Sequence, residues 1–242
     1  MNVNSNGYVL GFAVVVCVAM SAALAVTANL LKPAQDAAAE FDRQKNVMAA
    51  AGLVTEGDPR PRSELEALYR ARVVEQVVDV TTGEVDAQKT RADVVAMKDK
   101  ADRERYRVVA VAKDAQGNDE VFVLPISGKG LWSTLFGYLA LEKDADTVRG
   151  ITFFKHGETP GLGGEVDNPE WKAKWKGKTV LDGGKLVSVA VKKGRVDPAI
   201  AREQAHMVDG LSGATITCNG VTKFVKKDLE AFKPYLSKLW KN

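Results

Sequence analysis

The run from Asp209 to Thr217 (DGLSGATIT) places hydroxyl groups on small residues directly ahead of a predicted amphipathic helix. This helix is predicted because apolar residues recur at helical spacing from Val221 to Trp240, with lysines and acids on the other face. The first N–H groups of a helix lack partners within it and carry the positive end of its dipole, so they favour an anion. The run therefore predicts a phosphate site, with Thr217 pointing at the bound group.

Two further glycine-rich segments could line the same ligand. They are Ser127–Ser133 (SGKGLWS) and Lys155–Gly164 (KHGETPGLGG). Together they offer hydroxyls, N–H groups, a carboxylate and apolar residues, which suits a planar, amphipathic ligand with a phosphate tail. Glycine-rich segments between strands are more often simple turns, and Trp132 could equally be a core aromatic. His156 and Glu158 could form an acid/base pair, although a histidine satisfied by structural hydrogen bonds is the simpler interpretation.

The familiar nucleotide and hydrolase motifs are absent from the sequence. Gly161–Val166 does not complete Gly-x-Gly-x-x-Gly, and Gly-x-x-x-x-Gly-Lys-Ser/Thr does not occur. Gly210–Gly213 reaches its second glycine one residue too early for a nucleophile elbow. The only histidines and cysteines are His156, His206, Cys17 and Cys218. We therefore expect no serine hydrolase, no dinucleotide fold, no disulfide framework and no metal site.

Four segments together carry a resemblance to a known family. Ser212–Thr217 (SGATIT) resembles the Ser-Gly-Ala-Thr-x-Thr flavinylation motif of covalent FMN-binding domains. The other three, in chain order, are Gly130–Ser133, His156–Gly163, and Asn168–Trp171 followed by Trp175 and Gly177. The flavinylation motif is also found in Rnf-type electron-transfer complexes and in some reductases. All four segments in this order resemble the C subunit of the Na+-translocating NADH:quinone oxidoreductases, and the resemblance extends over nearly the whole chain.

The resemblance implies that Thr217 holds FMN through a phosphoester bond and that no side chain of this subunit is catalytic by itself. A threonine hydroxyl is a poor nucleophile, and no histidine or lysine base adjoins Thr217, so a separate FMN transferase with FAD as donor is expected to form the bond. The resemblance also implies which residues line the flavin. They are Ser212, Gly213, Ala214 and Thr215; Glu158, Thr159, Gly161, Leu162 and Gly163; and, opposite, Leu131, Trp132 and Ser133. Thr215 could instead be a capping hydroxyl, and Cys218 is expected to be a small packed residue.

The implied function is electron transfer within a membrane NADH:quinone oxidoreductase that is coupled to Na+ export. The expected partners are the other membrane and flavin subunits and, for maturation, the FMN transferase. Nucleic acid is not expected, because the net charge of +3 is small and mixed in sign. Two alternatives stay open. One is an Rnf-type subunit with covalent FMN, and the other is a non-catalytic membrane-anchored binding or assembly module whose glycine loops are only turns.

The N-terminus is expected to anchor the chain in a bacterial inner membrane. Tyr8–Leu31 is almost continuously apolar and, as a helix rising about 1.5 Å per residue, it can span a hydrocarbon core of about 30 Å. A cleaved signal peptide fits less well, because no positive residue precedes the apolar run and the run is too long. Lys32, Arg43 and Lys45 follow the span and none precedes it, which alone favours a cytoplasmic domain. The resemblance implies a periplasmic domain, and we adopt that orientation for a single-pass protein.

The elements that must position these segments predict an α+β fold. Helices are expected over 34–51, ending at Gly52, and from Ser63 to Val77, opened by a capping box of Ser63 and Glu66. Predicted strands are 107–112 paired with 121–126, 137–142 paired with 148–154, and 186–191. Few long spacers separate the strands, so a mainly antiparallel sheet flanked by helices is expected. The predicted division is an anchor over 1–33, a helical stalk and packing segment over 34–100, and one soluble FMN-binding domain over 101–242.

Overall fold

The structure is a computed structural model that describes residues 5–55 and 57–240. The chain forms two compact units, one up to Asp42 and the other from Arg43 onward. The predicted segment boundaries after residues 33 and 100 stay a prediction. The first residues of the predicted anchor, 1–4, and the last residues of the predicted FMN-binding domain, 241–242, lie outside the described residues.

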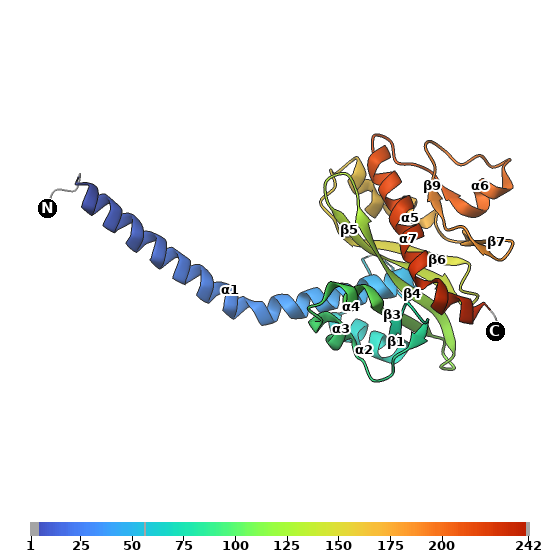
Figure 1. The fold of residues 1–242 in the computed structure, drawn as a ribbon, viewed down its shortest axis with the longest axis horizontal. Helices are drawn as coiled ribbons and strands as arrows, with labels where there is room; N and C mark the ends of the chain where they lie inside the picture. Colours follow the sequence, from blue (N-terminus) through green and yellow to red (C-terminus); the bar gives the residue numbers. More distant parts are fainter. Residues whose placement is uncertain (1–4, 56, 241–242) are drawn as a thin grey trace. The chain divides into compact units, whose positions relative to one another are not determined.

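Helix α1 (Asn6–Ala50) contains the predicted anchor and continues beyond it, as the sequence indicates (Figure 1). Among the described residues, it is the one helix long and apolar enough to cross a membrane. It ends at the glycine that the sequence predicts as its stop. Gly52 has φ +72°, and the N–H groups of Gly52 and Leu53 donate to the carbonyls of Ala49 at 3.1 Å and Met48 at 2.9 Å. A glycine in this left-handed conformation closes a helix without steric cost.

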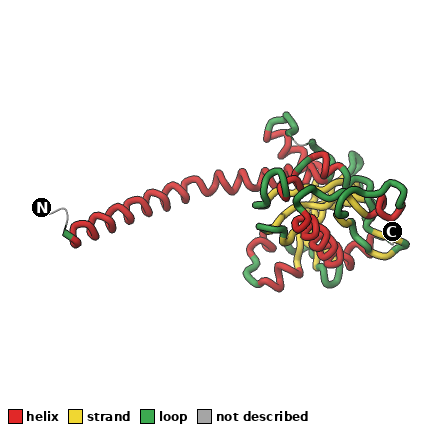
Figure 2. Tube along the Cα trace, turned by 90° about the horizontal axis from the view of Figure 1, so that it is seen from above, coloured by secondary structure: helices red, strands yellow, loops and turns green. Residues whose placement is uncertain are grey.

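One six-stranded sheet dominates the second unit (Figure 2). Its strands are β1 (Val73–Asp79), β2 (Glu84–Val85), β3 (Tyr106–Lys113), β4 (Asp119–Lys129), β5 (Thr134–Glu142) and β6 (Val148–Lys155). The order is β2-β1-β3-β4-β5-β6, and all neighbouring pairs are antiparallel. Both predicted strand pairs and the α+β fold class are therefore confirmed.

Helix α7 (Thr215–Leu239) lies across β4 and covers one face of the sheet (Figure 1). Alternate residues of β4, among them Phe122 and Leu124, share a core cluster with Phe224 and Phe232 of α7. The helix comes so close to the strand at Gly128 that a Cβ atom there would overlap the side chain of Phe224. This contact fixes the position of the first turns of α7 beside the end of β4.

The end of α1 covers the other face of the sheet. Val47 and Met48 are fully buried, and Ala50 is almost so. Gly150 of β6 faces the Ala50 carbonyl, 2.7 Å from where its own Cβ would be, and the Thr152 hydroxyl donates to the Asn46 carbonyl at 3.3 Å. The sheet is thus packed between helices on both sides, and its core is apolar on both faces.

The second predicted helix is wrong in its extent. Helix α2 covers Arg62–Arg72 and begins after Pro61 without a side-chain cap, so the capping box is also wrong. The residues that were expected to continue the helix form β1 instead, where Val77 pairs with Val108 of β3. β-Branched valines fit a pleated strand well, and pairing with the sheet outweighs their helical spacing.

The remaining elements are short and connect the main layers. They are α3 (Arg91–Ala96), α4 (Lys100–Arg105), η1 (Gly163–Asp167), α5 (Pro169–Ala173), α6 (Ala201–His206), β7 (Leu181–Asp182), β8 (Lys185–Leu186), β9 (Ala190–Val191) and β10 (Met207–Val208). The continuous strand predicted over 186–191 is wrong. Ser188 has φ +72°, and the N–H groups of Val187 and Ser188 both donate to the Val180 carbonyl, at 2.8 and 3.0 Å. This bend separates β8 from β9.

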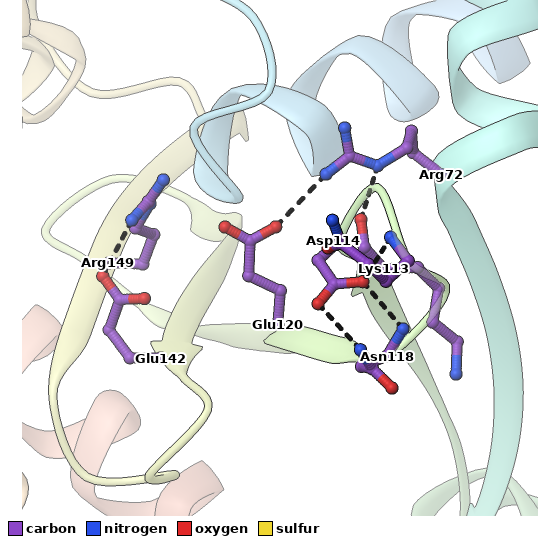
Figure 3. A network of polar contacts seen from close by, with 8 residues as sticks. Arg72, Lys113, Asp114, Asn118, Glu120, Glu142 and Arg149 are labelled. Atoms are coloured by element: carbon purple, nitrogen blue, oxygen red, sulfur yellow. Dashed lines mark hydrogen bonds and ion pairs between the residues drawn. The ribbon is translucent and has the colours of Figure 1, made fainter.

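A network of charged residues holds the turn between β3 and β4 (Figure 3). Asp114 accepts from the backbone N–H and the side-chain amide of Asn118, at 2.9 and 3.1 Å. Arg72 at the end of α2 donates to Glu120 at 3.2 Å and to the Lys113 carbonyl at 2.5 Å. Such partly exposed pairs add little stability each.

Candidate functional site

Thr217 lies inside the first turn of α7, because the helix begins at Thr215. The prediction that the hydroxyl-rich run lies wholly ahead of the helix is therefore wrong. Ala214 precedes the helix and provides no side-chain cap, so the first-turn N–H groups remain available to a ligand. The Thr217 side chain is buried, with 1% of the residue exposed.

Glu158, which follows β6, bonds to both of the other predicted segments. Its Oε2 accepts from the Thr217 hydroxyl at 2.6 Å and from the Leu131 N–H at 3.1 Å. Its Oε1 accepts from the N–H groups of Trp132 at 2.9 Å and Ser133 at 3.0 Å. One buried carboxylate thus joins the loop after β4, the loop after β6 and the start of α7.

These hydrogen bonds decide the charge of Glu158. Burial raises the pKa of its carboxyl group, but the bonds from Thr217 and from the N–H groups of Ser133, Trp132 and Leu131 outweigh burial and lower the pKa from 4.5 to about 2. Hydrogen bonds to the charged form of a carboxyl group favour that form. Glu158 is therefore a carboxylate at neutral pH, although only 5% of it is exposed.

Glycines allow the three segments to approach this closely. A Cβ atom on Gly163 would lie 2.6 Å from Thr217 Oγ1 and 2.9 Å from Glu158 Oε2. A Cβ atom on Gly130 would lie 2.7 Å from Glu158 Oε1, and one on Gly213, where φ is +72°, would lie 2.7 Å from a methyl carbon of Leu162. A side chain at any of these positions would push the segments apart.

The outer part of the site is apolar and open. Trp132 is 67% exposed, and Leu131 and Leu162 are each a little over 40% exposed. The alternative that Trp132 is a core aromatic is therefore wrong. Thr159 holds the loop beside it, because its carbonyl accepts from the N–H groups of Leu162 at 3.1 Å and Gly164 at 2.9 Å. Of the remaining predicted residues, Ala214 is buried and the exposed ones are Gly161, Ser212, Gly213 and Thr215.

The structural interpretations of His156 and Cys218 are confirmed. His156 Nε2 lies 2.6 Å from Asp167 Oδ2, and its Nδ1 accepts from the Glu158 N–H at 3.2 Å, so the ring does not contact the Glu158 carboxylate. Cys218 is buried, its Sγ accepts from the Leu211 N–H at 3.4 Å, and burial raises the pKa of the thiol.

Helix α5 holds the beginning of the Asp209–Thr217 run. Trp171 Nε1 donates to the Asp209 carbonyl at 2.8 Å, and Lys174 pairs with the Asp209 carboxylate at 2.7 Å. Across the described part of the chain, no three His, Cys, Asp or Glu side chains gather to hold a metal ion. Sequence reasoning missed the bond between Glu158 and Thr217, because the two residues are 59 positions apart and only the fold brings them together.

Comparisons with known proteins agree with this architecture. Residues 130–230 match the family of FMN-binding domains. The C subunit of the Na(+)-translocating NADH-quinone reductase of Pseudomonas aeruginosa is 39% identical, over 99% of this chain and 98% of that protein. Its counterpart of the same name in Haemophilus ducreyi is 38% identical, over 89% and 87% of the two chains.

Solved structures give the same result. The crystal structure of the C subunit of Na(+)-translocating NADH-quinone reductase from Parabacteroides distasonis is similar with a TM-score of 0.71 and 31% identity, covering 86% of this chain and 97% of that one. The crystal structure of NqrC from Shewanella oneidensis is similar with a TM-score of 0.68 and 29% identity, covering 85% and 100%.

Proposed function

Since this chain belongs to the family formed by the C subunit of Na(+)-translocating NADH-quinone reductases, we propose that it carries FMN, as a phosphoester of Thr217, and passes electrons between neighbouring redox centres. One observation carries the proposal. The Thr217 hydroxyl lies where three segments of the FMN-binding domain meet, beneath apolar side chains that are exposed to solvent.

The residues present fit FMN in three respects. The first turn of α7 has N–H groups without a side-chain cap, which suits the single negative charge of a phosphodiester. Gly163 and Gly213 lack Cβ atoms, and this lets the two loop segments meet closely around Thr217 and Leu162. Exposed Trp132 and Leu131 offer apolar surface to one side of a planar ring, with Leu162 opposite.

Each group of residues then has a distinct task. Thr217 holds the phosphate, and Ser212, Gly213, Ala214 and Thr215 surround it. Leu131, Trp132 and Ser133 would hold the ring, together with Thr159, Gly161, Leu162 and Gly163. When bound, FMN supplies the reversible electron uptake, which protein side chains do not provide. A phosphoester leaves the ring chemically free, so this bond retains the cofactor without setting the electronics of the ring.

The proposed setting is a membrane complex that couples NADH:quinone oxidoreduction to Na+ export. Other subunits would bind NADH and conduct the ion, because the apolar stretch of α1 carries no ionisable side chain except Cys17 and Tyr8, and a single such helix forms no ion path. A separate FMN transferase would attach the cofactor. A periplasmic domain would give the covalent bond a purpose, because free FMN is not replenished there.

Flavin fluorescence tests the proposal directly. The full-length chain, expressed in membranes with an FMN transferase, should give a band that fluoresces under ultraviolet light on a denaturing gel. Thr217→Ala should abolish the fluorescence, whereas Ser237→Ala should retain it, because Ser237 lies near the other end of α7 and its hydroxyl donates to the Lys233 carbonyl at 2.6 Å. A dark wild-type band would favour the non-catalytic binding module. Co-purification with components of an Rnf-type complex would favour that alternative.

A further inference from the structure

We propose that Glu158 is the proton acceptor for flavin attachment, holding the hydroxyl proton of Thr217 and taking it as the bond to phosphorus forms. The inference rests on the proposed function and adds a chemical role for a residue that otherwise only lines the pocket. It also supplies the base that the sequence around Thr217 lacks.

The geometry is that of an activated hydroxyl. Thr217 Oγ1 donates to Glu158 Oε2 at 2.6 Å, within the range of short hydrogen bonds to a charged acceptor. The carboxylate cannot turn away, because its Oε1 accepts from two backbone N–H groups at 2.9 and 3.0 Å. With its proton directed at Glu158, the Thr217 oxygen keeps its lone pairs for phosphorus. Only 1% of Thr217 is exposed, so the surrounding residues must move before a phosphorus atom can reach this oxygen.

No other titratable group in the described hydrogen-bond network is bonded to the Thr217 hydroxyl. The His156 ring is occupied by Asp167 and by the Glu158 N–H. Lys129 donates to the Trp132 carbonyl at 3.2 Å, and the buried Cys218 thiol accepts from Leu211. Glu158 is thus the base that the fold presents to this oxygen.

The step balances without a change of oxidation state. Thr217 Oγ bonds to the flavin-side phosphorus of a flavin adenine dinucleotide supplied by the transferase, and the phosphoanhydride bond breaks to release AMP. The hydroxyl proton passes to Glu158 and then to the released phosphate or to water. Because Glu158 holds a proton weakly, transfer occurs late, when bonding to phosphorus has made the hydroxyl acidic. We therefore expect a contribution of about 100-fold, the low end for general base catalysis.

The test is the initial rate of labelling of the full-length chain by purified transferase and flavin adenine dinucleotide, read as protein-bound fluorescence. Glu158→Gln should label about 100-fold more slowly than wild type. Glu165→Gln is the matched control, since Glu165 lies in the same region and accepts from Asn168 at 3.0 Å instead of from Thr217. It should label at the wild-type rate.

The pH profile separates a proton acceptor from a merely structural residue. The ratio of the wild-type rate to the Glu158→Gln rate cancels the ionisations of the transferase. The other titratable groups near this hydrogen-bond network are His156, Asp167, Lys129 and Cys218. This ratio should fall as the pH rises from about 6 to about 8.5, because hydroxide replaces the missing base. Formate should partly restore labelling of Glu158→Ala.

Two results would overturn the inference alone, with the proposed function intact. One is labelling of Glu158→Gln within about 3-fold of wild type. The other is slow labelling with a pH-independent ratio and no effect of formate, which would assign Glu158 a structural role. A dark wild-type chain would overturn the proposed function and this inference together.

Discussion

Gly163 is the position at which the geometry of the site can be tested most sharply. Replacing it with alanine puts a methyl carbon 2.6 Å from Thr217 Oγ1 and 2.9 Å from Glu158 Oε2, between the two groups that form the central hydrogen bond. The closest of these contacts is about 0.8 Å shorter than the 3.4 Å at which ordinary van der Waals contact begins. Either the loop moves outward or the hydrogen bond is broken.

The expected loss in the free energy of unfolding of Gly163→Ala follows from those two outcomes. Overpacking of this kind costs about 1–3 kcal/mol, and loss of a hydrogen bond to a charged group costs about 1.5–3 kcal/mol. The two are alternatives rather than additive, and alanine recovers about 0.4–1 kcal/mol by restricting the unfolded chain. We expect a net loss of about 1.5 kcal/mol and, for a domain of this size, a fall in Tm of about 3–6 °C.

Thermal unfolding of the unlabelled full-length chain in detergent, followed by near-ultraviolet circular dichroism, measures this loss. Gly157→Ala is the matched control in the same loop, because its new methyl carbon would meet Ser133 Cβ at an ordinary 3.4 Å. It should change the free energy of unfolding by less than about 0.5 kcal/mol. A Gly163→Ala protein as stable as this control, and labelled as fast as wild type, would refute the close approach of Gly163 to Thr217.

Two further predictions concern buried charges. The pKa of Glu158 is lowered from 4.5 to about 2 in the folded chain, so its carboxylate adds about 3 kcal/mol of stability above pH 4.5, and this is lost as the pH falls toward 2. The stability difference between wild type and Glu158→Gln, measured by urea unfolding, should shrink by more than half between pH 7 and about pH 3; an unchanged difference would contradict the assigned cause. Asp228, 3% exposed, accepts from Arg107 at 2.7 Å and from the Ser127 N–H at 2.8 Å, so Asp228→Ala should cost about 3–5 kcal/mol by leaving Arg107 without this partner. A loss below about 1 kcal/mol in denaturant unfolding would show that the pair is not buried as described.

The parts of the fold that local pattern determines were predictable. The strand pair that became β3 and β4 is marked by two short apolar runs with Gly117-Asn118 between them, and Gly52 stops α1 as expected. Val73–Val78 was not predictable, because its valines suit both periods and the pairing with β3 decides between them. The start of α7 was also missed. Thr215 and Ile216 are indifferent helix formers, and the helix extends over them where its first turns pack on β4.

The candidate site, like the fold, has parts that were predictable from the sequence and parts that were not. The three segments that meet at Glu158 could be named from sequence, because each is short and contiguous. Their connection through Glu158 could not, because it depends on how the loop after β6 turns toward α7 and on the space that Gly163 and Gly130 leave. The exposure of Trp132 is likewise a property of the folded loop, since a tryptophan beside glycines suits a core or a surface equally well.

The 67% exposure of Trp132 has a consequence for how tightly the pocket must bind. A ligand tethered to Thr217 by one bond is present at an effective concentration on the order of millimolar or above, so walls with only millimolar affinity keep it docked. The proposed attachment would therefore not require a deep enclosing cleft. Exposed side chains of this kind would leave one edge of the proposed flavin ring uncovered, and electrons would enter and leave through that edge without release of the cofactor.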